Sequence, residues 1–303
     1  MVITMGGMGL GQVMGGFDDG VTNVLFIIAS VFVSIAVVPI LVTAGQAPEF
    51  SAPEQVSLRR LYSISPLAMV GMLFQGVSTA MTFGMGTAYA KSIGMTSSQA
   101  SLFLVAVTIG TMLLQYPVGR LSDVLDRRLV IFLVAMISAT AAAAATFFSA
   151  EQFWPLITLT AIYGGFSMTI YSLCIAHAND YLTPSQMVGT ASTLIMVNGI
   201  GAIVGSPLIA VFMDLLSNRA YFIGLAIIHV TTGIYALARM KARAPVPAEA
   251  QGPFIAVPEA GTAIAATLNP EAAWDDITED DDLATGIISA NPYLELPPQT
   301  DNN

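Results

Sequence analysis

The charged residues that could do chemistry gather in one short run, residues 119–128, with the sequence GRLSDVLDRR. The run holds three arginines and two aspartates. It lies between two uncharged stretches, 97–117 and 129–149, each about long enough to cross a bilayer. A carboxylate at a helix end can rest against the positive end of a neighbouring helix, and arginines can bind anionic lipid head groups. The arrangement predicts a tight polar loop at one membrane face.

Other residue types offer little chemistry, and we expect no catalytic residue, cofactor or metal. The chain has no phosphate loop, HExxH motif or nucleophile elbow. His177 and Asp180 lie near one loop without a cysteine or second histidine beside them, and Cys174 is the single cysteine. The acidic tail and the scarcity of basic residues also argue against nucleic-acid binding. The sequence therefore predicts a protein that is not an enzyme.

The composition is that of a membrane protein: 303 residues, 55% hydrophobic and 10% charged, with a mean hydropathy of +0.73. Because backbone groups in lipid must satisfy one another, the apolar stretches should all be helices, which makes the fold an all-α polytopic membrane protein. A shorter apolar segment occupies 1–16. We expect seven complete spans, near residues 21–44, 64–89, 97–117, 129–149, 153–176, 186–213 and 220–238.

The basic residues predict the orientation, because short cytoplasmic loops carry an excess of Lys and Arg. When successive loops alternate between the two sides, one side receives only Lys91 and Arg219. The other side, which we expect to be cytoplasmic together with the C-terminus, receives Arg59, Arg60, Arg120, Arg127, Arg128, Arg239, Lys241 and Arg243.

Residues 244–303 have a different composition, with no Lys or Arg and with eleven of the chain's twenty acidic residues. Low hydrophobicity with one sign of charge predicts a solvated, disordered acidic tail. Within it, Trp274 stands before DDITEDDDL, which is either a docking motif for a partner or part of a solubilising appendage.

Glycines repeat at a constant offset, because Gly7 and Gly11 precede Gly201 and Gly205 by 194 residues each. Closely spaced glycines let two helix backbones approach, so these four are candidate helix-packing positions. The offset indicates two similar halves, as in transporters built from internal repeats.

Several motifs together resemble the major facilitator superfamily. Residues 119–128 resemble its GxLaDrxGrr loop, and GMGLGQVMGG at 7–16 is similar to the GxxxGPxxGG pattern of its fifth helix, with Gln12 in place of proline. QYPVGRLSD, at 115–123, is most similar to the YcaD-type branch. The chain departs from the loop pattern at Asp126, where the family usually has glycine, which puts the geometry of the turn in doubt.

The resemblance implies a partial fold: a truncated helix five, followed by helices six to twelve of a twelve-helix transporter, with the earlier N-terminal helices missing. It divides the chain into the end of the N-terminal half (1–44), a central cytoplasmic loop (45–61), a C-terminal six-helix half (62–243) and the tail (244–303). It also implies a gating role for the loop, with Asp123 resting against the N-terminus of helix five. The loop residues are Gly119, Arg120, Asp123, Arg127 and Arg128. The alternative is that the arginines anchor the loop to anionic lipid.

Polar residues form stripes at helical spacing within the spans, and the helices that correspond to them line the central cavity of such transporters. The same residues could instead hydrogen-bond between helices. The spans carry no acidic or basic residue away from their ends, so no proton-carrying carboxylate is evident, and His229 is the one titratable candidate. Candidate solute contacts are Gln75, Thr79, Tyr163, Ser167, Tyr171 and Asn198.

We therefore expect a secondary transporter of the bacterial inner membrane that moves a small-molecule solute by alternating access. The alternative is a non-transporting membrane scaffold, anchored in the lipid bilayer, whose acidic cytoplasmic tail recruits a partner.

Overall fold

The computed structural model describes residues 2–15, 23–42, 56–242, 246, 251–252 and 254–256. Every regular element in these ranges is a helix, which confirms the all-α prediction. In chain order the elements are α1 (Val2–Gly15), α2 (Val24–Val42), α3 (Leu58–Ile64), α4 (Pro66–Thr79), the π-helical η1 (Ala80–Gly84), α5 (Met85–Ser92), α6 (Ser97–Val124), α7 (Arg127–Ala145), the short η2 (Ala150–Gln152), α8 (Phe153–Ser167), α9 (Thr169–Asn179), α10 (Pro184–Leu215) and α11 (Ala220–Ala242).

Six helical segments of the described chain are long and apolar enough to cross a membrane. They correspond to six of the seven predicted spans. The remaining one, predicted at 21–44, coincides with the 19-residue apolar helix α2 and stays a prediction. The six are Pro66–Ser92, Ser97–Val124, Arg127–Ala145, Ala150–Asn179, Gln186–Leu215 and Ala220–Ala242.

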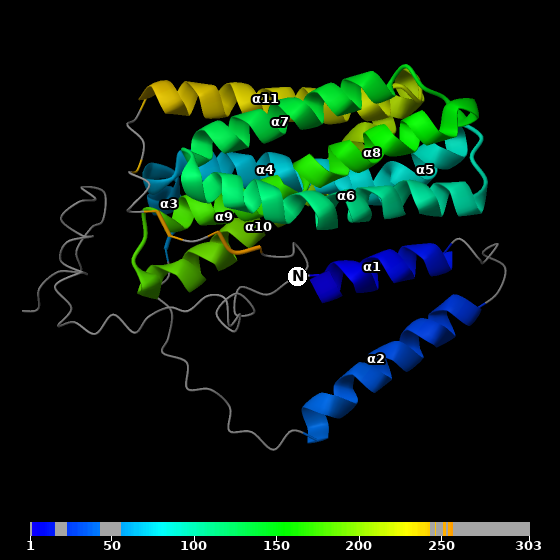
Figure 1. Ribbon diagram of the computed structural model, residues 1–303, viewed down its shortest axis with the longest axis horizontal. Coiled ribbons are helices and arrows are strands. Elements are labelled where there is room, and N and C mark those ends of the chain that lie inside the picture. The colour runs from blue at the N-terminus through cyan, green and yellow to red at the C-terminus, as the bar shows by residue number, and fades with distance from the viewer. Residues whose placement is uncertain are drawn as a thin grey trace, which may run out of the picture.

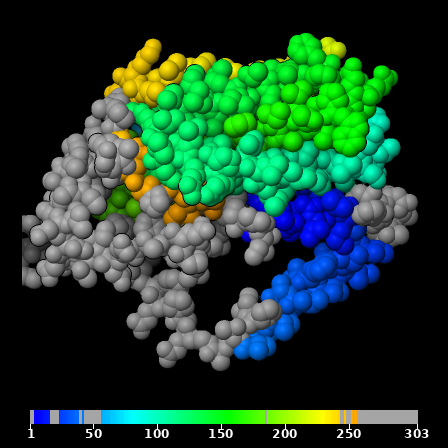
Figure 2. Space-filling model, in the orientation of Figure 1, coloured from blue at the N-terminus to red at the C-terminus, as the bar shows by residue number. Residues whose placement is uncertain are grey.

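The helices from α4 to α11 lie side by side in one elongated bundle, while α1 runs along α6 and α2 leans away from the rest (Figure 1). A space-filling view shows α1 seated against the face of the bundle (Figure 2). The short α3, the junction between α6 and α7, and the final turn of α11 all lie at one end, which we call the loop end (Figure 1). Most of the predicted cytoplasmic Lys and Arg residues belong to these three places.

Local sequence explains where the long helices begin. The Thr96 hydroxyl accepts a hydrogen bond from the Gln99 N–H, and the Gln99 side chain accepts one from the Thr96 N–H, which forms a capping box at the start of α6. A capping box also involves Thr183 and Gln186 at the start of α10. Both helices contain an internal proline, which membrane helices tolerate.

Two predicted continuous spans are interrupted in the middle of the bundle. The first changes from α-helix to a π-helical turn at Ala80–Gly84 before continuing as α5. The other breaks at Met168, between α8 and α9. π-Helical turns of this kind are often found at functional sites.

Glycines bring α4 and α10 into backbone contact. A Cβ added at Gly201 would lie 2.1 Å from the Leu73 carbonyl oxygen, and one at Gly205 would lie 2.3 Å from that of Val77. At Gly76, on the opposite helix, the added Cβ would lie 1.9 Å from the Asn198 carbonyl oxygen. Only residues without a side chain fit at these positions.

The other two candidate packing glycines, Gly7 and Gly11 in α1, make no close contact with another described helix. An added Cβ at either of them meets no described atom within 4 Å. The contact between α1 and α6 is made instead near Gly9, whose added Cβ would lie 3.7 Å from Thr108.

Two apolar clusters hold the bundle together, one towards each end. The cluster nearer the loop end includes Leu61, Val118 and Val130. The far cluster is aromatic at its centre, where Tyr89 stacks on Tyr221 at 4.4 Å between ring centroids. The polar residues described next lie at the loop end and around Tyr163, which also belongs to the far cluster.

Candidate functional site

Most residues of the predicted tight polar loop are helical, and only Leu125 and Asp126 lie outside a helix. Helix α6 does not stop at Pro117 but continues to Val124, and only two residues separate it from α7. Gly119, Arg120 and Asp123 therefore lie in the last turns of α6, and Arg127 opens α7. The helix continues because a proline costs it little more than one backbone hydrogen bond in lipid, where neighbouring helices compensate.

Asp126 explains how the junction turns without the glycine of the family pattern. Its carboxylate accepts a hydrogen bond at 3.0 Å from the Arg128 N–H, so Asp126 is the N-cap of α7. Its φ is −55°, and the only residue with positive φ in the described ranges is Gly94. Burial opposes ionisation of Asp126, but hydrogen bonds from the Arg128 side chain and backbone, with the charges of Arg128 and His177, lower the pKa of Asp126 below its usual value.

Arg127 is the centre of the loop end, and it is only 1% exposed. Its guanidinium donates to the Ala176 carbonyl at 2.9 Å, forms an ion pair with Asp180, and donates to Asp123 at 3.3 Å. These contacts join α6, α7 and the end of α9. A buried arginine with two carboxylate partners is a strong tie, because removing one partner leaves an uncompensated charge.

Asp180 is a member of this site that the sequence did not reveal as a partner of the arginine run. It follows α9 directly as its C-cap and lies 53 residues after Arg127 in the chain. Burial raises the pKa of Asp180 to about 7, against the lowering effect of the Arg127 guanidinium and of the Gly252 N–H. A single buried acidic residue at the end of an apolar stretch is the only signal that could have pointed to it.

The three arginines of the junction differ in exposure, which limits the lipid-anchor alternative. Arg127 and Arg128 are both buried, and the Arg128 side chain pairs with Asp126 at 2.7 Å. Arg120 is exposed and lies over the Tyr116 ring, 5.1 Å from its centroid. Only Arg120 is therefore free to meet lipid head groups.

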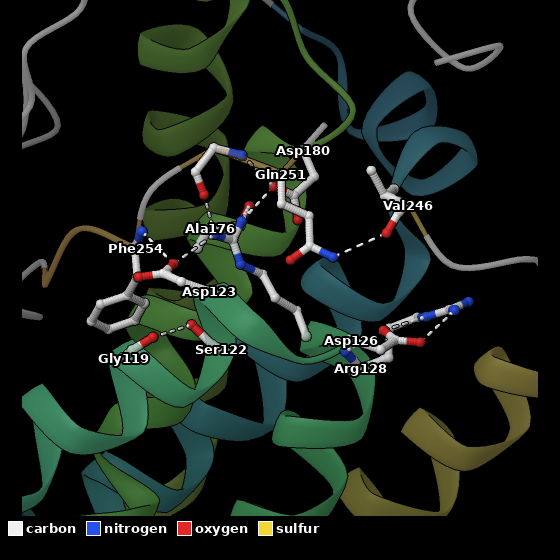
Figure 3. A network of polar contacts seen from close by, with 12 residues as sticks. Gly119, Ser122, Asp123, Asp126, Arg128, Ala176, Asp180, Val246, Gln251 and Phe254 are labelled. Carbon is white, nitrogen blue, oxygen red and sulfur yellow. Dashed lines mark hydrogen bonds and ion pairs between the residues drawn. The ribbon is translucent and has the colours of Figure 1, made fainter. Parts of the chain in front are cut away.

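A short segment that follows α11 lies across the loop end. We call residues 251–252 and 254–256 the strap; they belong to the sequence predicted to be a disordered tail, most of which lies outside the described residues. The Phe254 N–H donates to the Asp123 carboxylate at 2.8 Å, and the Gly252 N–H donates to Asp180 at 3.3 Å (Figure 3). The Gly252 carbonyl accepts a hydrogen bond from Arg127. The partners described for Asp123 are thus Arg127 and the strap, and its contact with helix five stays a prediction.

Two of the candidate solute contacts lie in a buried polar cluster in the middle of the bundle. The Tyr163 hydroxyl is 2.8 Å from the Ser78 hydroxyl and 3.0 Å from that of Thr82, while Ser167 lies 2.8 Å from His229 Nε2. These hydrogen bonds connect α4, η1, α8 and α11. We call these five residues the central polar cluster; they are Ser78, Thr82, Tyr163, Ser167 and His229.

His229 has a defined tautomer within this cluster. Its Nδ1 lies 2.8 Å from the Leu225 carbonyl, which can only accept, so Nδ1 carries the proton. In the neutral ring, Nε2 then accepts from Ser167. The sequence marked His229 as titratable but did not point to Ser78, whose short polar side chain gives no periodic signal.

The other candidate solute contacts are partly buried or buried elsewhere. The Gln75 amide donates to Thr79 at 3.2 Å within the first span, and the Asn198 amide donates to the Met72 carbonyl at 3.4 Å, between α10 and α4. Tyr171 is buried in the cluster nearer the loop end. Several candidates therefore make hydrogen bonds between helices, as the alternative interpretation of these residues expected, and Thr79 and Asn198 are the two that keep partial exposure.

Comparisons with known proteins agree with the motifs. The sequence pattern of the Major Facilitator Superfamily matches residues 67–294. An uncharacterised transporter of this type, YcaD of Escherichia fergusonii, is 23% identical over 201 residues, which is 63% of this chain and 49% of the relative. YcaD of Salmonella paratyphi B is 25% identical over 169 residues, covering 53% of this chain and 41% of the relative. The chain thus spans about half the length of the curated relatives it matches.

Among solved structures, the E. coli fucose:proton symporter FucP is similar with a TM-score of 0.46 and 16% identity, covering 71% of this chain and 54% of that one. The outward conformation of FucP gives a TM-score of 0.44 at 17% identity, covering 72% and 54%. The match over 67–294 takes in most of the six spans, the arginine run and the central polar cluster, so the chain belongs to the major facilitator superfamily.

Proposed function

We propose that this chain forms part of a secondary transporter of the bacterial inner membrane, which moves a small solute by alternating access. The observation that carries the proposal is the superfamily match over residues 67–294. The helices from α3 to α11 act as one bundle, which rocks against a second bundle around a shared cavity. In this proposal the chain binds a small-molecule solute and is embedded in the lipid bilayer.

The charge distribution supports a cytoplasmic position for the loop end. Arg59 and Arg60 lie in the first turn of α3, and Arg239 and Lys241 lie in the last turn of α11. The junction of α6 and α7 carries three arginines. The opposite end carries Lys91 and Arg219. Short cytoplasmic segments are the ones that concentrate Lys and Arg.

The roles of individual residues follow from exposure and contacts. Thr79 and Asn198 keep partial exposure on α4 and α10, which makes them the best positions for solute contact. Asp123 is the gating residue, because its side chain is 39% exposed at the loop end while it holds Arg127. The central polar cluster positions α4, α8 and α11 relative to one another.

Alternating access can be tested without knowing the solute. Cys174 is buried and is the only cysteine of the chain, so a Cys174→Ser background leaves one introduced thiol to label. We expect Asn198→Cys to react with a membrane-impermeant maleimide both in right-side-out and in inverted vesicles, because the cavity opens to each side in turn. The matched control is Ile227→Cys, on an apolar exposed face of α11, which should react from neither side.

Labelling from one side only, or from neither, would contradict alternating access. Labelling from neither side is the result expected of the membrane scaffold, whose helices only anchor the chain. The test thus separates the two functions on one preparation.

A further inference from the structure

The strap binds the loop end through main-chain groups and one aromatic ring. Its two described N–H donors go to carboxylates of different helical segments, Asp123 in α6 and Asp180 after α9. Its Gly252 carbonyl accepts a hydrogen bond from Arg127 of α7. One short segment therefore bridges the ends of three helices at once (Figure 3).

Gly119 provides the seat for the aromatic ring. A Cβ added at Gly119 would lie 2.3 Å from Phe254 Cδ1, so the ring rests directly on the backbone of α6. Phe254 and Ile255 both pack against the apolar cluster nearer the loop end. The glycine that opens the arginine run is thus also the position on which the strap depends.

The N-terminal residue of the strap, Gln251, also makes a hydrogen bond. The Gln251 amide donates to the Val246 carbonyl at 3.0 Å, and Val246 is itself buried. The strap therefore lies at the loop end, where α11 also ends, and its contacts satisfy groups there that are buried or carry charge.

We propose that the strap is an intramolecular latch, which docks on Gly119, Asp123, Arg127 and Asp180 and restrains the loop-side ends of α6, α7 and α9. This proposal rests on the proposed function, because a latch matters only if these ends move. A transport cycle that changes the loop end must release the strap, so the strap slows the exchange between the two open states.

Docking is tested by hydrogen–deuterium exchange on the full chain in detergent. In the unaltered protein the strap amides should exchange slowly, and Phe254→Ala should accelerate them by at least about fivefold, because a net hydrogen bond or apolar contact is worth about 1 kcal/mol. Trp274→Ala, which removes an aromatic ring elsewhere in the C-terminal sequence, is the control and should leave the strap amides unchanged. Equal exchange in the unaltered chain and in Phe254→Ala would overturn docking.

Restraint is tested by the rate at which Asn198→Cys is labelled in vesicles. With the latch weakened by Phe254→Ala, labelling from both sides should become several-fold faster, while Trp274→Ala should not change it. Faster strap exchange without faster labelling would overturn the latch but leave the proposed function standing. Labelling from one side only, in every variant, would instead reject the proposed function and the regulatory part of this inference with it, while the exchange experiment still decides whether the strap docks.

Discussion

Two polar regions of the bundle use opposite means to satisfy buried groups. The loop end is charged, and a single arginine, Arg127, donates hydrogen bonds to carboxylates and carbonyls of several segments. The central polar cluster is built from hydroxyl groups and the His229 ring, and it distributes its hydrogen bonds among four elements. Charge at the membrane surface can be local and strong, whereas polar groups at depth must be small and mutually satisfied. The loop end should therefore depend on one residue and the centre on many.

The largest expected effect is at Arg127. Arg127→Ala leaves the Asp180 carboxylate buried without its cation, so we expect the free energy of unfolding to fall by about 3–5 kcal/mol. Thermal unfolding of purified protein in detergent would measure this. Arg120→Ala is the matched control, because this arginine is exposed, and it should change stability by no more than about 0.5 kcal/mol. Similar losses in both variants would contradict a loop end that depends on Arg127.

Next in size is the glycine contact between α4 and α10. Gly201→Ala places a Cβ 2.1 Å from the Leu73 carbonyl oxygen, so α4 and α10 must separate, at a cost of about 1–3 kcal/mol. Gly7→Ala, in α1, meets no described atom within 4 Å and should be neutral or slightly stabilising. Thermal unfolding of the two variants side by side checks the difference. Equal stability would mean that α10 does not need its close approach to α4.

In the central polar cluster we expect a smaller loss. Ser167→Ala removes the hydroxyl that faces His229 Nε2 and should cost about 1–2 kcal/mol, because a buried acceptor loses its donor. Ser138→Ala is the matched control, since the Ser138 hydroxyl is equally buried but bonds only to the Val134 carbonyl of its own helix. The same unfolding measurement applies. A larger loss for Ser138→Ala would show that the cluster does not tie the helices together.

The smallest effect is at the cap of α7. Asp126→Ala should lower stability by about 1 kcal/mol at neutral pH, because it removes the N-cap of α7 together with an ion pair to Arg128 that is partly open to solvent, the Asp126 side chain being 25% exposed. Because the pKa of Asp126 is lowered in the folded protein, its stabilisation is present above the usual carboxylate pKa and is lost as pH falls through the lowered value. Unfolding midpoints of the two proteins should therefore converge in acid. A difference that persists or grows with acidification would contradict the capping role.

The helices could be predicted from the sequence, whereas the ends of the helices and the partners of the polar residues could not. The apolar stretches predicted the helical fold, because long uncharged segments have few alternatives in lipid. The glycines Gly201 and Gly205 lie at the contact between α4 and α10. The ends of the helices were harder to predict. Pro117 indicated the end of a span, but α6 continues to Val124.

The partners of the motif residues could not be predicted because they lie far away in sequence. Nothing near Arg127 in the chain points to Asp180 or to the Gly252 carbonyl, and only folding brings them together. In the same way, Tyr163 and Ser167 stood out by helical spacing, but their partners Ser78 and His229 come from α4 and α11. Composition alone also placed the strap within a solvated tail, because its few apolar residues are outnumbered by the acidic sequence that follows.

The membrane side of the loop end is the most direct test of the whole account, because the gate, the latch and the orientation all depend on it. Arg120 is exposed there, so Arg120→Cys in the Cys174→Ser background offers a thiol to an impermeant maleimide. The account predicts rapid labelling in inverted vesicles and none in right-side-out vesicles or intact cells. Labelling from the outside of intact cells would contradict it.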